Sequence, residues 1–152
     1  MFFYCSIIFV LLFSIDPTHK VSVKNDFAYT ETDSIPAIFK GDFKDDYDIR
    51  YTISDSLWLQ YPGAKYHILK WNIQEQYIIA RNDSKNPSEK DLYSRIDYML
   101  LNNMGKWTWG FCLTVYDASS ETAAARSKPA DRQNPKKGCN GFPFSRMRQI
   151  EK

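Results

Sequence analysis

Histidine, cysteine and glycine are scarce in this chain of 152 residues, which has two His, three Cys and six Gly. So few histidines and cysteines do not make the four-ligand clusters that hold structural zinc. The sequence also lacks a Gly-x-Ser-x-Gly motif and any Cys–His spacing typical of a known protease. We therefore expect no catalytic constellation, no metal site and no cofactor. The net charge of +2 does not favour nucleic acid as a partner.

No apolar run in the sequence has the length that spans a bilayer comfortably. The longest, FFYCSIIFVLLFSI over residues 2–15, has the length of the hydrophobic region of a signal peptide. It predicts a signal or anchor segment over 1–16, a polar tether over 17–37 and a single domain over 38–150. The protein is then exported to the periplasm, the cell envelope or the outside, and meets a membrane only through this segment. The alternative is a buried N-terminal strand.

Aromatic residues are abundant and make up 16% of the chain, with ten Phe, ten Tyr and four Trp. They bury large areas and fit the pleated surface of a sheet, so they favour a core rich in β structure. Six runs of alternating or aromatic residues are spaced at roughly ten residues and separated by turns. These runs cover residues 49–53, 57–61, 66–71, 76–81, 93–101 and 107–116.

This order of runs predicts a mostly β fold, an antiparallel up-and-down meander. We expect the meander to form a small barrel or a strongly curved sheet, because an open aromatic edge aggregates. Ser119 or Ser120 is placed to cap one short C-terminal helix that ends in an Ala-rich stretch. The following stretch over 129–147 is rich in Pro, Gly and Asn, and we expect it to be irregular and to pack across the sheet through Phe142 and Phe144.

Only two of the three cysteines lie in the predicted domain. Cys5 lies inside the apolar N-terminal run, which leaves Cys112 and Cys139 in the domain. An even pair in an exported chain predicts a disulfide, and one of this span contributes about 3 kcal/mol on the chain-entropy model. The alternative is two separate thiols, one of them buried in a strand.

Two resemblances to known families follow from local motifs. The segment FKGDFKDDY over 39–47 resembles the opening of a lipocalin, with Phe43 near the position of the Trp in the lipocalin Gly-x-Trp. The later lipocalin signatures are missing, and six runs fall short of eight strands. YHILKWN, QYIIARND, WTWGFC and GCNGFPFSRM, between residues 41 and 147, resemble small uncharacterised exported proteins of Bacteroidota. The lipocalin resemblance implies a barrel and an apolar ligand; the second implies no activity.

The aromatic runs supply candidate ligand-binding residues. In a barrel, such side chains form the walls of a cavity, and an inward-facing arginine fixes a polar or anionic end of the ligand by bidentate pairing. The alternative is that the aromatics are solid core and the arginines lie in solvent at strand ends. The candidate walls are Trp58, Trp71, Tyr77, Tyr98, Trp107 and Trp109, and the candidate arginines are Arg81 and Arg95.

The leading interpretation is therefore an exported, non-enzymatic binding protein for a small apolar or amphipathic ligand. One alternative is an interaction module that contacts an envelope protein through a basic C-terminal tail over 126–148. Another is an enzyme centred on His67, which requires a carboxylate beside the imidazole. The Asp cluster over 42–48 fits a Ca²⁺ loop less well than an ordinary turn, because it lacks the central Gly and closing Glu of an EF-hand.

Overall fold

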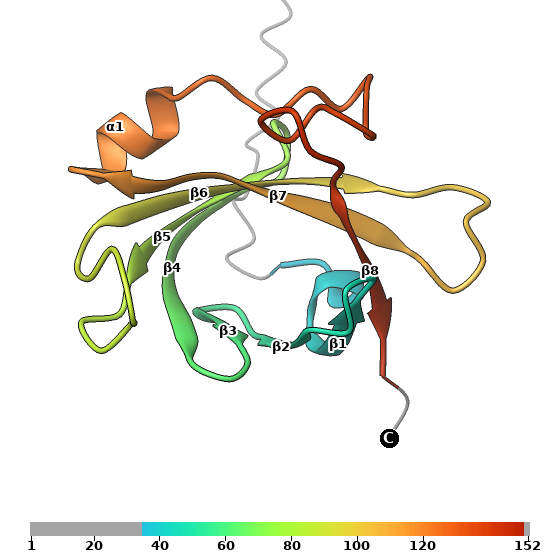
Figure 1. The fold of residues 1–152 in the computed structure, drawn as a ribbon, viewed down its shortest axis with the longest axis horizontal. Helices are drawn as coiled ribbons and strands as arrows, with labels where there is room; N and C mark the ends of the chain where they lie inside the picture. Colours follow the sequence, from blue (N-terminus) through green and yellow to red (C-terminus); the bar gives the residue numbers. More distant parts are fainter. Residues whose placement is uncertain (1–34, 151–152) are drawn as a thin grey trace, which may run out of the picture. The chain divides into compact units, whose positions relative to one another are not determined.

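The computed structural model describes residues 35–150. Its eight strands form one closed antiparallel barrel, in which each strand pairs with the next and β8 returns to pair with β1 (Figure 1). The predicted mostly β meander, its closure and the short helix are confirmed. The predicted signal segment, and the tether up to residue 34, lie outside the described residues. The elements are η1 (Ala37–Phe39), β1 (Gly41–Asp45), β2 (Arg50–Ile53), β3 (Leu57–Gln60), β4 (Ala64–Asn72), β5 (Tyr77–Asn82), β6 (Tyr93–Leu100), β7 (Trp109–Ala118), α1 (Glu121–Arg126) and β8 (Ser145–Gln149).

The count of six strands was wrong, because β1 and β8 were not recognised as strands. β1 lies in the Asp-rich stretch, and β8 carries arginines on either side of one methionine. Each strand places a large apolar side chain in the core, Phe43 and Met147, and both are fully buried. A single large apolar residue in a charged segment gives no recognisable alternation, so the pattern failed at the two strands that close the barrel.

The barrel interior is packed with aromatic rings. Trp58 of β3 contacts Trp109 and Phe111 of β7 across the barrel, with ring centroids 5.9 and 5.0 Å apart. Most pairs meet edge to face, which is a favourable arrangement for aromatic quadrupoles. The buried residues of this core are Ile35, Phe39, Phe43, Tyr51, Ile53, Trp58, Ile78, Ile96, Tyr98, Trp109, Phe111 and Met147.

The outer face of β5, β6 and β7 is covered by α1 and the segment that follows it (Figure 1). The Ser120 hydroxyl caps α1 by accepting a hydrogen bond from the backbone N–H of Ala123, at 3.1 Å, as one of the two predicted serines should. Ala124 of the helix packs against Tyr77 and Ile79, which point outward from β5. No helix within residues 35–150 combines the length and the apolar character needed to cross a bilayer.

The predicted disulfide between Cys112 and Cys139 is present and closes a span of 27 residues. It ties the irregular segment after α1 to β7, and it is compatible with an oxidising compartment. Phe144 is buried beside the bridge with Ala130. Phe142, which we expected to pack on the sheet, is 71% exposed, because the tight turn that contains it projects the ring into solvent.

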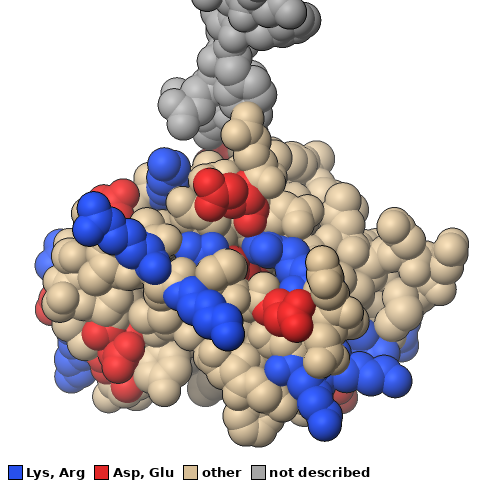
Figure 2. Space-filling model, turned by 90° about the horizontal axis from the view of Figure 1, so that it is seen from above, with Lys and Arg blue, Asp and Glu red and all other residues tan. Residues whose placement is uncertain are grey.

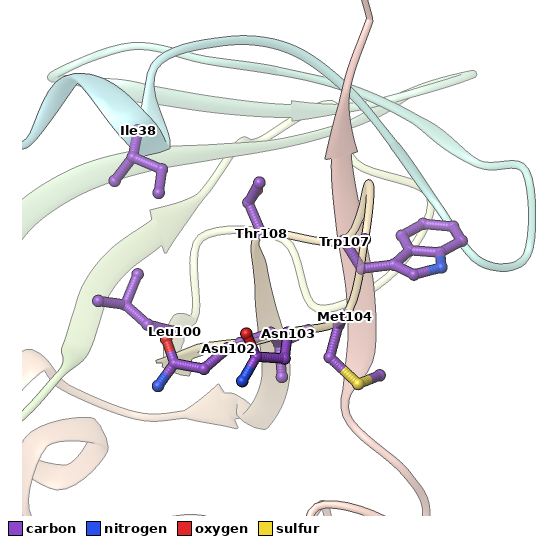
Figure 3. Close-up of a pocket in the computed structure, with 9 residues that line it drawn as sticks. Ile38, Leu100, Asn102, Asn103, Met104, Trp107 and Thr108 are labelled. Atoms are coloured by element: carbon purple, nitrogen blue, oxygen red, sulfur yellow. The ribbon is translucent and has the colours of Figure 1, made fainter.

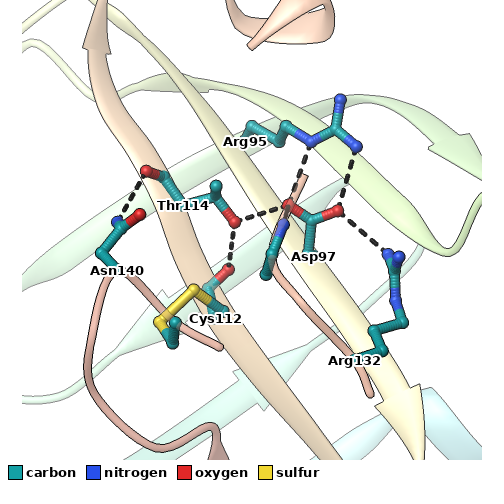
Figure 4. Close-up of a disulfide and its surroundings, with 8 residues drawn as sticks. Arg95, Asp97, Cys112, Thr114, Arg132 and Asn140 are labelled. Atoms are coloured by element: carbon teal, nitrogen blue, oxygen red, sulfur yellow. Dashed lines mark hydrogen bonds and ion pairs between the residues drawn. A yellow bond between two sulfur atoms is a disulfide. The ribbon is translucent and has the colours of Figure 1, made fainter. Parts of the chain in front are cut away.

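The outer cover is also held by one buried carboxylate, Asp97 of β6 (Figure 4). Arg95 donates to both of its oxygens at 3.0 Å, and Arg132 from the covering segment donates to one of them at 3.0 Å. The Thr114 hydroxyl and the backbone N–H of Ala130 complete the set. Arg95 also stacks over the Tyr77 ring at 4.0 Å. Asp97 thus joins β6, β7 and the covering segment at one point, and Arg95 extends the contact to Tyr77 of β5.

Asp97→Asn should destabilise the fold by about 3 kcal/mol or more, because it leaves the buried Arg95 guanidinium without its counter-charge. The free energy of unfolding, measured by urea denaturation, checks this. Asp91→Asn is the control, because Asp91 pairs with Arg81 in solvent, and it should change stability by less than about 1 kcal/mol. Equal effects from the two variants would contradict a structural role for the Asp97 network.

Candidate functional site: a pocket beside the aromatic interior

The up-and-down topology divides the connections between the two ends of the barrel. The turns after β2, β4 and β6 gather at one end, and η1 enters β1 at this same end. We call it the η1 end. The connections after β1, β3, β5 and β7 gather at the opposite end.

Phe39 closes the η1 end by inserting its ring among the interior aromatics. Its centroid lies 4.7 Å from that of Tyr98, 5.2 Å from that of Trp109 and 5.9 Å from that of Trp71. The ring is 4% exposed, although η1 itself is a single turn of three residues without a side-chain cap. The Phe39 ring therefore closes the barrel interior at this end. We call Phe39 the plug, and residues 35–40, which carry it, the plug segment.

Asp55, in the turn after β2, holds the plug segment in place. Its carboxylate accepts from the backbone N–H of Ile35 at 3.2 Å and pairs with Lys40 at 2.6 Å. Its carbonyl oxygen accepts from the Trp71 indole at 3.2 Å. The hydrogen bonds from Lys40 and from the Ile35 N–H hold the pKa of the Asp55 carboxyl below its usual range. The Asp55 carboxylate thus contacts the chain both before η1, at Ile35, and after it, at Lys40.

A pocket of about 250 Å³ lies at the η1 end, between η1 and the β6–β7 connection. Figure 3 shows Ile38 on one side and Leu100, Asn102, Asn103 and Met104 on the other, with Thr108 between them. Ile38, Leu100 and Met104 are 41%, 48% and 40% exposed. The nine lining residues are all uncharged. The pocket therefore suits an apolar group with room for a neutral polar one.

Residues that line the pocket lie next to interior aromatic residues in the sequence. Ile38 precedes the plug residue Phe39, Leu100 lies two residues beyond Tyr98 on the same strand, and Thr108 precedes Trp109. These neighbours are interior aromatic residues, and the Phe39 ring contacts those of both Tyr98 and Trp109. The pocket therefore lies on chain segments that carry Phe39, Tyr98 and Trp109, while these three buried rings are not part of its lining.

Two polar atoms of this interior are unpaired. Within residues 35–150, neither the Tyr98 hydroxyl nor the Trp109 indole nitrogen has a hydrogen-bond partner. The two side chains are 2% and 1% exposed. Burial raises the pKa of Tyr98 to about 12. A buried polar group without a partner costs stability, so these two atoms require an explanation.

A second buried tyrosine in the same barrel provides the contrast. The Tyr51 hydroxyl donates to the Asp45 carboxylate at 2.9 Å. The other oxygen of Asp45 accepts from the backbone N–H groups of Tyr47 and Ile49, each at 2.9 Å, and so caps the β1–β2 turn. Burial and the Asp45 charge raise the pKa of Tyr51 above its ordinary range. Tyr51 has a structural role that Tyr98 lacks.

The predicted ligand-binding residues divide between the two faces of the barrel wall. Trp58, Tyr98 and Trp109 are buried inside, and Trp71 packs beside them. Trp107 lines the pocket with its ring turned away from Ile38 (Figure 3). Tyr77, Arg81 and Arg95 do not join them: Tyr77 lies under α1, Arg95 is held by Asp97 on the outer face, and Arg81 pairs with Asp91 in solvent at 2.9 Å. The expectation of an inward-facing arginine was therefore wrong.

The sequence did not point to Ile38, Leu100 or Met104 as site residues. The only signal was that apolar side chains flank or occupy the turn Asn102-Asn103-Met104-Gly105, where polar residues are usual. A pocket built from a turn and a segment more than 60 positions away depends on closure of the barrel.

His67 has the carboxylate that an enzymatic role would require. Its Nε2 lies 2.7 Å from an Asp83 carboxylate oxygen. The hydrogen bonds from His67 and from the backbone N–H of Lys85 hold the pKa of Asp83 below its usual range. The pair lies near the end opposite η1, where the imidazole is half exposed. Within residues 35–150, the bond to Asp83 is the only hydrogen bond of the His67 side chain. The pair does not approach the pocket.

The basic residues of the C-terminal stretch are not gathered on a tail. Arg132 is held by Asp97, and Arg146 pairs with Asp46 at 2.9 Å from within β8. Lys136 and Lys137 are exposed. On the face covered by α1, basic side chains are interspersed with acidic and uncharged ones (Figure 2). The predicted basic surface is therefore divided by internal ion pairs.

The four carboxylates of the Asp cluster point to different partners. Asp42 accepts from Thr52, Asp45 from Tyr51, Asp46 from Arg146, and Asp48 pairs with Lys44 at 2.9 Å. The cluster forms the end of β1 and its turn into β2.

No family model, curated protein or solved structure matches this chain. The class of protein is therefore defined by the geometry alone: a closed eight-stranded antiparallel barrel with an uncharged pocket at its η1 end.

Tyr98→Phe should raise the free energy of unfolding by about 1 kcal/mol, because it removes a buried hydroxyl that has no partner. Tyr51→Phe is the matched control and should lower it by about 2 kcal/mol, because it removes a hydrogen bond to a buried carboxylate. Urea denaturation of both variants measures the difference. A loss of stability in Tyr98→Phe would show that the hydroxyl is already satisfied.

Proposed function

We propose that this protein binds a small, neutral, apolar or amphipathic molecule in the pocket at the η1 end of the barrel. The observation that carries the proposal is the pocket itself: about 250 Å³, with three apolar side chains held about half exposed around an uncharged lining. Exposed apolar groups that converge on a concavity are typical of ligand sites. The closed barrel behind them supplies a rigid wall.

The lining indicates the chemistry of the ligand. Ile38, Leu100 and Met104 offer contacts to an apolar body, and methionine adapts to irregular shapes. The amides of Asn102 and Asn103 and the hydroxyl of Thr108 offer donors and acceptors to a neutral polar group. The arginines once expected to hold an anion lie elsewhere, so we propose a neutral ligand in place of an anionic one.

We also propose that the protein acts in an exported, oxidising location. The support is the Cys112–Cys139 disulfide, since such bridges persist in exported proteins, together with the apolar run over 2–15. A carrier of apolar molecules would serve in such an aqueous compartment, because apolar ligands dissolve poorly in water.

Leu100→Glu should weaken binding of the apolar fluorophore N-phenyl-1-naphthylamine to the full chain by about tenfold or more, because it places a charge in the apolar lining. The fluorescence increase on titration measures the dissociation constant. Leu100 is 48% exposed, so the substitution leaves the core intact.

Leu69→Glu is the matched control. Leu69 is also a strand leucine, is also 48% exposed, and does not line the pocket. It should leave the dissociation constant unchanged. If the two variants weaken binding equally, or if the fluorophore does not bind the wild-type chain, the proposed pocket is not a binding site.

A further inference from the structure

We propose that Tyr98 and Trp109 form a hydrogen-bonding subsite for a neutral oxygen of the ligand, and that Phe39 occupies this subsite in the structure described. This inference rests on the proposed function and names the chemistry of the ligand and the route by which it enters.

The first observation is the pair of buried, unpaired polar atoms. The indole N–H of Trp109 only donates, and the hydroxyl of Tyr98 donates or accepts. An oxygen acceptor is the one type of group that both can bind. A carboxylate is disfavoured, because an ionised group is expensive to bury among aromatic rings without a counter-charge. A carbonyl, amide, ester or ether oxygen on a compact apolar body can accept a hydrogen bond from either atom.

The positive charge of Arg132 does not change this conclusion. Arg132 lies close to Tyr98, but its guanidinium donates to the backbone oxygens of Tyr98, Glu75 and Gln76 and to the Asp97 carboxylate. These groups lie on the wall and in the β4–β5 turn, and they occupy the guanidinium. The subsite inside the wall is therefore neutral.

The second observation is the position of Phe39. Its ring touches both Tyr98 and Trp109 at 4.7 and 5.2 Å between centroids, but a phenyl ring offers neither atom an oxygen. Phe39 packs against the rings that carry the two donors and leaves their hydrogen-bonding capacity unused. A ligand group that replaces the ring and carries an acceptor recovers that capacity.

The third observation is that, apart from the burial of Ile35 and Phe39, few polar side-chain contacts hold the plug segment. η1 has three residues, and the polar side-chain contacts that anchor it come from Asp55, whose side chain is 53% exposed in the pair with Lys40, and from Gln149, which donates to the Lys40 carbonyl at 3.5 Å. Exposed ion pairs of this kind contribute little. Ile38, the neighbour of Phe39, already lines the pocket. A ligand in the pocket is thus in contact with the segment that must move.

Isothermal titration calorimetry of the full chain with two probes tests the subsite. Acetophenone carries a carbonyl oxygen, and ethylbenzene has nearly the same outline without it. The measured quantity is the ratio of the two dissociation constants in each variant, which cancels the different hydration of the probes. Ethylbenzene alone reports on the apolar pocket.

Tyr98→Phe should shift this ratio against acetophenone by about threefold to tenfold, the value of one hydrogen bond. Trp109→Phe should shift it in the same direction. Tyr51→Phe, which removes a hydroxyl bonded to Asp45, should leave the ratio unchanged. Tyr98→Phe removes one oxygen atom from a well-packed ring, so it keeps the test valid if Trp109→Phe does not fold.

Asp55→Ala tests the plug. It loosens η1 without altering the interior and should strengthen binding of both probes about threefold, because less of the binding energy is used to displace Phe39. Arg81→Ala, which breaks an exposed ion pair at the opposite end, is the control and should have no effect.

The outcomes separate the two proposals. If neither probe binds the wild-type chain, the proposed function and this subsite both fail. If both probes bind but Tyr98→Phe and Trp109→Phe leave the ratio unchanged, the pocket stands and the hydrogen-bonding subsite is refuted. If Asp55→Ala leaves both affinities unchanged, Phe39 does not occupy the site that the ligand uses.

Discussion

The pairing of β1 with β8 is the constraint on which the rest of the structure depends. It joins residues about 100 positions apart through the register Phe43↔Gln149, Lys44↔Arg148 and Asp45↔Met147. Closure removes both sheet edges and forces alternate residues of every strand into one interior. The aromatic rings then have to fill that space, and η1, which leads directly into β1, is placed at the end of the barrel. The pocket follows, because η1 lies against the long connection between β6 and β7.

Buried polar groups that have hydrogen-bond partners and those that lack them lie on opposite sides of the barrel wall. On the outer face, Asp97 is fully paired with two arginines, a hydroxyl and a backbone N–H, and with the disulfide it binds the covering segment to β6 and β7. On the inner face, Tyr98 and Trp109 are buried without partners. A satisfied network is typical of structure, whereas a buried polar group without a partner requires an explanation, and we propose that a ligand supplies the missing partner. The same strand, β6, contributes Asp97 outward and Tyr98 inward.

The binding that we propose would act against stability at the η1 end. The Phe39 ring fills the interior and stabilises the fold through apolar contact, but it leaves two donors unused. The half-exposed Ile38, Leu100 and Met104 likewise give up burial that a more compact turn would provide. Proteins retain such unfavourable features where activity requires them.

The class of fold was determined by the sequence itself. Six runs with a period of two residues, separated by Asn, Gly and Pro turns, specify an antiparallel meander, because each turn is too short for any other connection. The Ser120 cap and the Cys112–Cys139 pairing were also readable, since they depend on local chemistry and on parity. β1 and β8 were not readable, because each has one large apolar side chain among charges and becomes a strand only when its partner is present.

Only the tertiary structure decided the site. Alternation assigned Tyr77, Arg95 and Tyr98 to strands but did not say which face is the interior, and a helix that covers the outer face buries residues there as thoroughly as the core does. For that reason Tyr77 and Arg95 look like interior residues in the sequence and lie outside the barrel. The pocket unites Ile38 with Leu100 and Met104 through closure, a contact between distant segments that no local pattern encodes.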